Sequence, residues 1–150
     1  MIRISWETDY GLILLEYLCR DSGTGIHTAR EVADSARLPL PMASKILKTL
    51  AREGILVSHR GVKGGYSLAQ RPEEISLAEV IQALEGPIGI TECASRPGLC
   101  EKERACPTRV NWIRISQALR ESLQRIQLSE MFAPPPAALI PLGGARRSAP

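Results

Sequence analysis

Residues 41–69, PMASKILKTLAREGILVSHRGVKGGYSLA, decide the fold, because a helical pattern changes within them to two short β patterns. Apolar side chains recur at every third or fourth position from Pro41 to Arg52, which predicts a helix over that range. The runs 55–58 and 66–69 flank a basic tip that is rich in glycine, and they predict the two strands of a β-hairpin. The segment therefore predicts a helix that leads directly into a hairpin.

Helical patterns surround this segment on both sides. Apolar residues at helical spacing predict a first helix over residues 6–20. The sequences TARE (28–31) and SLAE (76–79) are capping boxes, in which a hydroxyl and a glutamate satisfy free amides at a helix start. We therefore expect a mainly α fold with a small β-hairpin wing, which is a winged helix-turn-helix domain over residues 1–88.

The rest of the chain divides into three segments. Residues 89–106 are irregular in pattern and carry three cysteines. A stripe of apolar side chains then predicts one long C-terminal helix over residues 107–130. The stripe consists of Trp112, Ile115, Leu119, Leu123 and Ile126. Residues 131–150 contain proline and glycine runs without apolar periodicity, so we expect a disordered tail.

Basic residues are concentrated around the predicted helix and hairpin. The formal net charge of the whole chain is only +3. Between residues 37 and 71, however, seven Lys and Arg side chains accompany a single acid, Glu53. Such a block suits a surface that faces DNA phosphates, although a solvated charged face is the alternative for the charges taken alone.

The predicted elements give these side chains separate roles on double-stranded operator DNA. Ser44 and Lys45 lie early in the helix, where side chains reach base edges in the major groove, and the later basic residues contact phosphates. Arg60 or Lys63, at the hairpin tip, is expected to enter a minor groove. The candidate DNA contacts are Ser44, Lys45, Lys48, Thr49, Arg52, Arg60 and Lys63.

Several other classes of protein are disfavoured. The glycines of the hairpin do not follow the G-x-x-x-x-G-K-[ST] order of a nucleotide-binding loop. The chain has two histidines, His27 and His59, and no evident pair of nucleophile and base, so we do not expect an enzyme. No apolar run is long enough for a membrane, and the N-terminal residues lack a secretory pattern, so we expect a cytoplasmic protein.

Three of the four cysteines, Cys93, Cys100 and Cys106, lie in the irregular segment, with six and five residues between them. In a reducing compartment, clustered cysteines indicate metal binding or redox sensing more often than disulfides. A zinc site typically uses pairs separated by two to four residues, so the wider gaps favour an iron–sulfur cluster. Zinc and metal-free thiols remain alternatives. We expect the fourth cysteine, Cys19, to be a small core residue.

These motifs together resemble the Rrf2 family of bacterial transcription regulators, from Met1 to about Glu130. The motifs are TDYG (8–11), SKILKTL (44–50), EGIL (53–56), the wing RGVKGGYSL (60–68) and the three-cysteine segment. This family includes IscR-like and SUF-type repressors of iron–sulfur assembly operons and the nitric oxide sensor NsrR. The opening motif is most similar to the SUF-type members.

The resemblance implies a homodimer joined by the C-terminal helix, with a 2Fe–2S or 4Fe–4S cluster whose state controls DNA affinity. It also implies repression of a SUF-type operon. A regulator stabilised by zinc, a thiol-redox regulator and a nitric oxide sensor are the alternatives.

The fourth cluster ligand departs from part of the family. Some members use a histidine three residues after the last cysteine, where this chain has Arg109, which cannot ligate. Another branch uses an aspartate near the N-terminus of the partner subunit, and Asp9 matches that place. The resemblance therefore implies Asp9 as the fourth ligand, with Glu7 as the second choice. In the simplest alternative, Asp9 only complements the dipole of the first helix.

Overall fold

The computed structural model describes residues 3–20, 25–98 and 100–134 of the chain. Its helices and strands are α1 (Trp6–Cys19), α2 (Ala29–Ala36), α3 (Leu40–Arg52), β1 (Leu56–His59), β2 (Gly65–Leu68), α4 (Leu77–Glu85), α5 (Glu92–Ser95), α6 (Arg109–Gln124) and α7 (Leu128–Met131). The two strands pair antiparallel, with Leu56 opposite Leu68 and His59 opposite Gly65. The predicted fold class, mainly helical with a β-hairpin wing, is confirmed, and each strand is shifted by one residue from its predicted position.

Both predicted capping boxes begin helices. At α2, the Glu31 N–H donates to Thr28 Oγ1 at 3.2 Å, and the Thr28 N–H donates to the Glu31 carboxylate at 2.7 Å. At α4, the corresponding distances between Ser76 and Glu79 are 3.3 and 2.7 Å. The turn from α2 to α3 passes through Arg37 in the left-handed conformation, with φ 54°. These local bonds set where the helices of the helix-turn-helix unit begin and turn.

A single apolar core lies between α1, α2, α3, α4 and the hairpin, and Leu128 also enters it. The side chains of Ile46, Leu47 and Leu50 on α3 are fully buried in this core. Because they hold one side of α3 against α1 and α4, the opposite side of the helix is left to solvent. Met42, which helical spacing also predicts to be buried, is half-buried.

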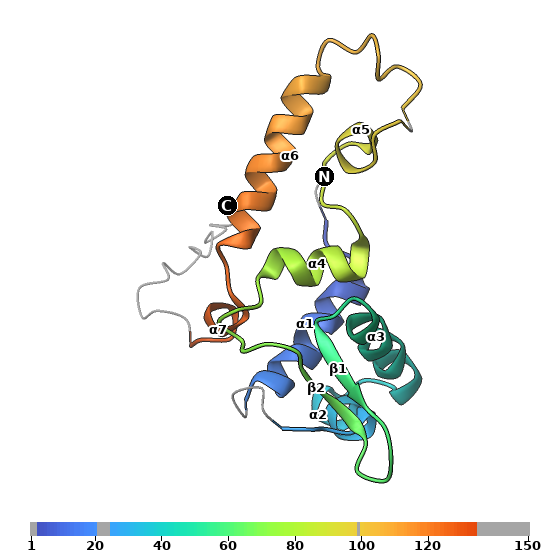
Figure 1. Ribbon diagram of the computed structural model, residues 1–150, viewed down its shortest axis with the longest axis vertical. Coiled ribbons are helices and arrows are strands. Elements are labelled where there is room, and N and C mark those ends of the chain that lie inside the picture. Colours follow the sequence, from blue (N-terminus) through green and yellow to red (C-terminus); the bar gives the residue numbers. More distant parts are fainter. Residues whose placement is uncertain (1–2, 21–24, 99, 135–150) are drawn as a thin grey trace, which may run out of the picture.

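The arrangement separates two ends of the molecule (Figure 1). The hairpin and α3 lie at one end, and α3 contacts β1 directly. Helix α6 extends towards the other end, where α5 and the segment between α5 and α6 are found. Helix α4 lies between these parts and contacts α1, α3 and α6. The candidate DNA face and the cysteine segment are therefore at opposite ends of the subunit.

The predicted C-terminal helix over residues 107–130 is shorter than expected. Helix α6 ends at Gln124, and a separate short helix, α7, begins at Leu128. Between them the Leu77 N–H donates to the Ile126 carbonyl at 2.8 Å, and the Leu128 N–H donates to the Ile75 carbonyl at 3.0 Å. The chain leaves the helix to make these bonds, which bring the Leu128 side chain into the core.

The tail predicted for residues 131–150 is corrected at its start, because Met131 belongs to α7 and Phe132 packs against the core. Residues 135–150 lie outside the described part of the chain. Within the described residues, no helix combines the length and the apolar character needed to cross a bilayer.

Candidate nucleic-acid interface and metal site

Helix α3 presents its predicted DNA contacts on the side that faces away from the core. Lys45, Lys48 and Arg52 are exposed, and Ser44 and Thr49 are half-buried. Two of the cations have acidic neighbours, because Lys45 Nζ lies 3.1 Å from a Glu7 carboxylate oxygen and Arg52 Nε lies 2.9 Å from Glu53. Lys48 has no ion-pair partner in the part of the chain that is described. The face is therefore basic, with one of its lysines held by an acid on α1.

The tip of the wing consists of residues 60–64, in which Arg60 and Lys63 are exposed. The Gly64 N–H donates to the Gly61 carbonyl at 2.9 Å, which closes the tip. A Cβ at Gly64 would lie only 2.5 Å from the His59 carbonyl, so a larger residue there would distort the turn. The tight tip presents two cations close to the backbone, as a minor-groove contact requires.

Val62, between these two cations, was missed by the sequence reasoning, and its side chain is completely exposed. A fully exposed apolar side chain at the tip of a wing suits contact with a groove wall. The signal in the sequence was an apolar residue placed between a glycine and a lysine at the centre of the turn.

A short bridge to the start of α2 fixes the wing against the helices. The His27 N–H donates to the Tyr66 carbonyl at 2.9 Å, and the Tyr66 N–H donates to the His27 carbonyl at 2.8 Å. His59 Nε2 also forms a hydrogen bond of 2.9 Å with Ser67 Oγ across the hairpin. A Cβ at Gly65 would collide with the His27 carbonyl, so this glycine permits the close approach. Sequence reasoning did not find the bridge, because isolated β-bridges have no periodic pattern.

All four cysteines are free thiols. Cys93 is buried on α5, and its Sγ lies 3.3 Å from Thr91 Oγ1. Cys106 is half-buried just before α6, where hydrogen bonds with Thr108 lower the pKa of its thiol. Cys19 is half-buried and packs against the core instead of lying within it. Burial raises the pKa of its thiol to about 11, which disfavours a reactive thiolate.

The three cysteines of the α5–α6 region are not gathered at one point in this conformation. Among the described residues, no three His, Cys, Asp or Glu side chains lie close enough to hold a metal ion. Asp9 is exposed in the first turn of α1, on the winged-helix side of the chain. The three cysteines provide soft thiolate ligands, which are the ligands that iron–sulfur clusters bind. The chemical type of the available ligands therefore fits such a cluster.

Glu103 and Arg109 form hydrogen bonds that connect the two ends of the segment that carries Cys100 and Cys106. The Gly98 N–H donates to one carboxylate oxygen of Glu103 at 2.6 Å. Arg109 donates from Nε and Nη2 to the other oxygen at 3.0 and 2.8 Å. The two donors lower the pKa of the Glu103 carboxyl group, the Gly98 bond having the larger effect. Arg109, which lies three residues after Cys106 and cannot ligate a metal, therefore organises the segment instead.

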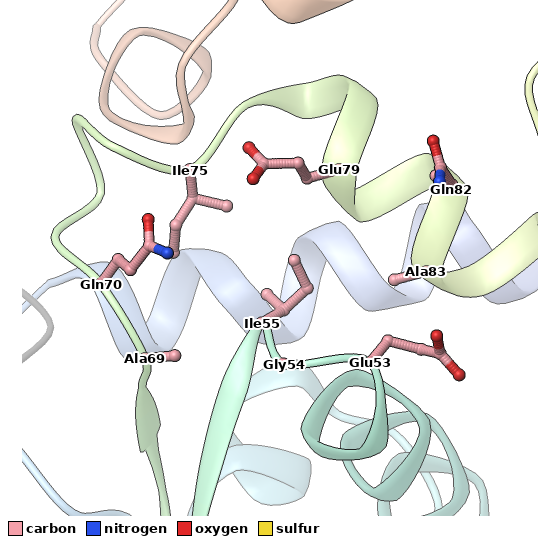
Figure 2. Close-up of a pocket in the computed structure, with 9 residues that line it drawn as sticks. All are labelled: Glu53, Gly54, Ile55, Ala69, Gln70, Ile75, Glu79, Gln82 and Ala83. Carbon is pink, nitrogen blue, oxygen red and sulfur yellow. The ribbon is translucent and has the colours of Figure 1, made fainter.

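A cavity of about 310 Å³ lies between the end of α3, the hairpin and α4 (Figure 2). Both of its carboxylates already have partners, because Glu79 caps α4 and Glu53 accepts from Arg52 Nε at 2.9 Å. No Ser, Cys, His or Lys is among the residues that line this cavity. The cavity therefore offers no pair of nucleophile and base.

The family model Rrf2, described as an iron-dependent transcriptional regulator, matches residues 4–134. The chain belongs to the Rrf2 family. It is 31% identical to the HTH-type transcriptional regulator CymR of Bacillus subtilis over 130 residues, which cover 87% of this chain and 89% of CymR. It is 32% identical to the HTH-type transcriptional regulator NsrR of Shouchella clausii over 133 residues, covering 87% and 85% of the two chains.

The solved structure of CymR, the global cysteine regulator of B. subtilis, matches with a TM-score of 0.67 and 30% identity, covering 88% of this chain and 97% of that one. The relatives are transcription regulators and not enzymes, as predicted for this Rrf2 protein. The present chain is therefore an Rrf2-family DNA-binding transcription regulator built on a winged helix. The predicted family resemblance is confirmed.

Proposed function

We propose that this Rrf2 protein regulates transcription in response to an iron–sulfur cluster held by Cys93, Cys100 and Cys106. The observation that carries the proposal is the position of three free thiols on the segment between α4 and α6. The description of the family model as iron-dependent supports it. A bound cluster would join the three thiolates through a redox-sensitive group. Without it, only the polypeptide would connect them.

Polar contacts connect this segment to α6. The Ile90 N–H donates to Ser116 Oγ at 3.0 Å, and the Ser116 side chain is fully buried. Arg120 Nη2 donates to the Ile88 carbonyl at 3.2 Å. Since α6 also packs against α4, a change in the cysteine segment has a direct route to the winged helix.

A second copy of the chain completes the regulator in this proposal. Helix α6 exposes Val110, Trp112 and Ile115, whose exposed fractions are 62%, 38% and 47%. Trp112 and Ile115 are three residues apart and therefore share one side of the helix. Large apolar side chains exposed together on one side of a helix are typical of a surface that another chain covers. Two copies present two α3 helices and two wings, so we expect a palindromic operator. The proposed contacts in each half-site are Ser44, Lys45, Lys48, Thr49, Arg52, Arg60 and Lys63.

The fourth cluster ligand in this proposal is Asp9 of the second copy, which lies exposed at the start of α1. A carboxylate is a harder ligand than a thiolate, so it would bind the cluster more weakly. The cluster would then be lost easily, which suits a sensor. The proposed target is a SUF-type assembly operon, on which the protein acts as a repressor.

Anaerobic purification tests the metal site. We expect a coloured protein containing iron and sulfide, and we expect Cys93→Ser, Cys100→Ser and Cys106→Ser each to remove both. Cys19→Ser is the matched control and should keep them, because Cys19 lies outside the segment. A colourless protein with one zinc per chain would instead support the zinc alternative. Asp9→Ala should shorten the lifetime of the absorbance in air, and an unchanged lifetime would exclude Asp9.

A thiol-redox regulator is the second candidate, because the lowered pKa of Cys106 favours a reactive thiolate. The similarity to CymR, a global cysteine regulator, supports the same alternative. A protein that takes up neither iron nor zinc but changes its DNA affinity on oxidation would favour this candidate.

A further inference from the structure

We infer that Glu7 restrains Lys45 and so limits the affinity of the α3 face for DNA. The inference rests on the proposed DNA face and is independent of the proposed cluster. Glu7 would act as a positioning residue, because its contact is with Lys45.

The ion pair joins the first turn of α1 to the exposed side of α3. Lys45 Nζ lies 3.1 Å from Glu7 Oε1. The two side chains differ in exposure, with 67% for Lys45 and only 25% for Glu7. The carboxylate is therefore held against the protein, while the lysine reaches it from the solvent side. Lys48, one turn further along α3, has no such partner among the described residues.

The backbone that carries Glu7 is fixed on two sides. The Ser5 N–H donates to Glu85 Oε1 at 2.7 Å, which ties the start of α1 to the end of α4. The Thr8 N–H donates to Ser5 Oγ at 3.3 Å, and the Thr8 side chain is fully buried. Because this turn is anchored, Glu7 cannot follow Lys45 far towards DNA. A contact between Lys45 and DNA therefore stretches or breaks the ion pair.

Two effects then oppose binding. DNA must displace the carboxylate from Lys45, and the carboxylate that is left repels the phosphate backbone near α3. An exposed ion pair is weak, so the displacement is feasible and its effect on affinity is moderate.

The test uses the metal-free full chain and a fluorescein-labelled duplex of random sequence, with affinity measured by anisotropy over a series of salt concentrations. We expect Glu7→Gln to bind about threefold to tenfold more tightly, because it removes one restraint and one repulsive charge. The slope of log affinity against log salt should steepen by about one per chain, since on a duplex of random sequence the released Lys45 can neutralise a phosphate. Lys45→Met should weaken binding. In the Lys45→Met background, Glu7→Gln should have much less effect.

Glu16→Gln is the control, because Glu16 lies on the same helix and pairs with Arg20 at 3.2 Å instead of with α3. It should leave the affinity unchanged, and thermal unfolding should show that all variants fold. Equal or weaker binding by Glu7→Gln overturns the inference alone. The same gain with and without Lys45 also overturns it, because it would show general repulsion. Unchanged binding by Lys45→Met overturns both the inference and the proposed DNA-binding face of α3. The Glu7→Gln and Lys45→Met results therefore distinguish a failure of the inference from a failure of the proposed DNA-binding face.

Discussion

Glu103 and Arg109 show how single side chains organise the proposed sensor. Arg109 stands three residues after Cys106, and its guanidinium donates two hydrogen bonds to Glu103. Glu103 also accepts the Gly98 N–H, so one carboxylate connects both ends of the segment that contains Cys100. Only 12% of the Glu103 side chain is exposed. This acid therefore fixes the shape of the segment before any metal is bound.

We predict that Glu103→Gln loosens residues 98–109 in the metal-free protein. Hydrogen exchange should become several-fold faster at the Gly98 amide, because a neutral amide is a weaker acceptor than a carboxylate. Glu101→Gln, at an exposed position in the same segment, is the control and should not change the exchange. Equal protection of Gly98 in all three proteins would contradict the proposed role of Glu103.

The same contact has a defined pH dependence. The folded-state pKa of Glu103 is lowered, so its stabilising effect is complete above the ordinary pKa of a glutamate and is lost as the pH falls through the folded-state value. The difference in exchange between wild type and Glu103→Gln should therefore disappear in acid.

At the scale of helices and strands, the winged helix was predictable because its signals are local. Thr28 and Glu31, like Ser76 and Glu79, are three residues apart, so the sequence itself shows the bonds that begin α2 and α4. The end of α6 was not predictable in this way. It depends on a backbone hydrogen bond between Ile126 and Leu77, which are distant in the sequence. An apolar stripe that continues to Ile126 cannot show such a bond.

Helix α6 should depend on Ser116 for its attachment to the cysteine segment. We predict that Ser116→Ala lowers the free energy of unfolding by about 1–3 kcal/mol, because the partly buried N–H of Ile90 loses its acceptor, the buried Ser116 hydroxyl. Urea unfolding of the metal-free protein measures this difference. Ser122→Ala, which removes an exposed hydroxyl that donates to the Ala118 carbonyl of the same helix, should change the stability by much less. Equal losses in the two variants would show that the buried bond is not special.

At the scale of the whole molecule, the exposed apolar side of α6 is what a second subunit would cover. We predict that Ile115→Glu converts the protein to a monomer that keeps its helical content, since Ile115 is 47% exposed and outside the core. Sedimentation velocity with circular dichroism measures both properties. Gln117→Glu, which adds the same charge at another exposed position of α6, is the matched control and should not dissociate the protein. A wild-type protein that is already monomeric would contradict the proposed dimer.

The candidate site was only partly predictable. The spacing of Cys93, Cys100 and Cys106 indicates which donors are available, because residue type and proximity can be read directly from the sequence. The arrangement of these donors depends on pairs such as Glu103 with Arg109, and the state of the DNA face depends on Glu7 with Lys45. Such pairs are set by how the elements pack, and no periodic pattern shows them.

The central claim is that the occupancy of the three-cysteine site changes how the protein binds DNA. The most direct measurement compares metal-loaded and metal-free protein on one duplex, selected from a random library with the metal-loaded form, at one salt concentration under anaerobic conditions. We expect the two affinities to differ by about tenfold or more, a typical coupling between two sites. The difference should disappear in Cys106→Ser. Equal affinities for the two forms, in a protein verified to carry iron and sulfide, would contradict the claim.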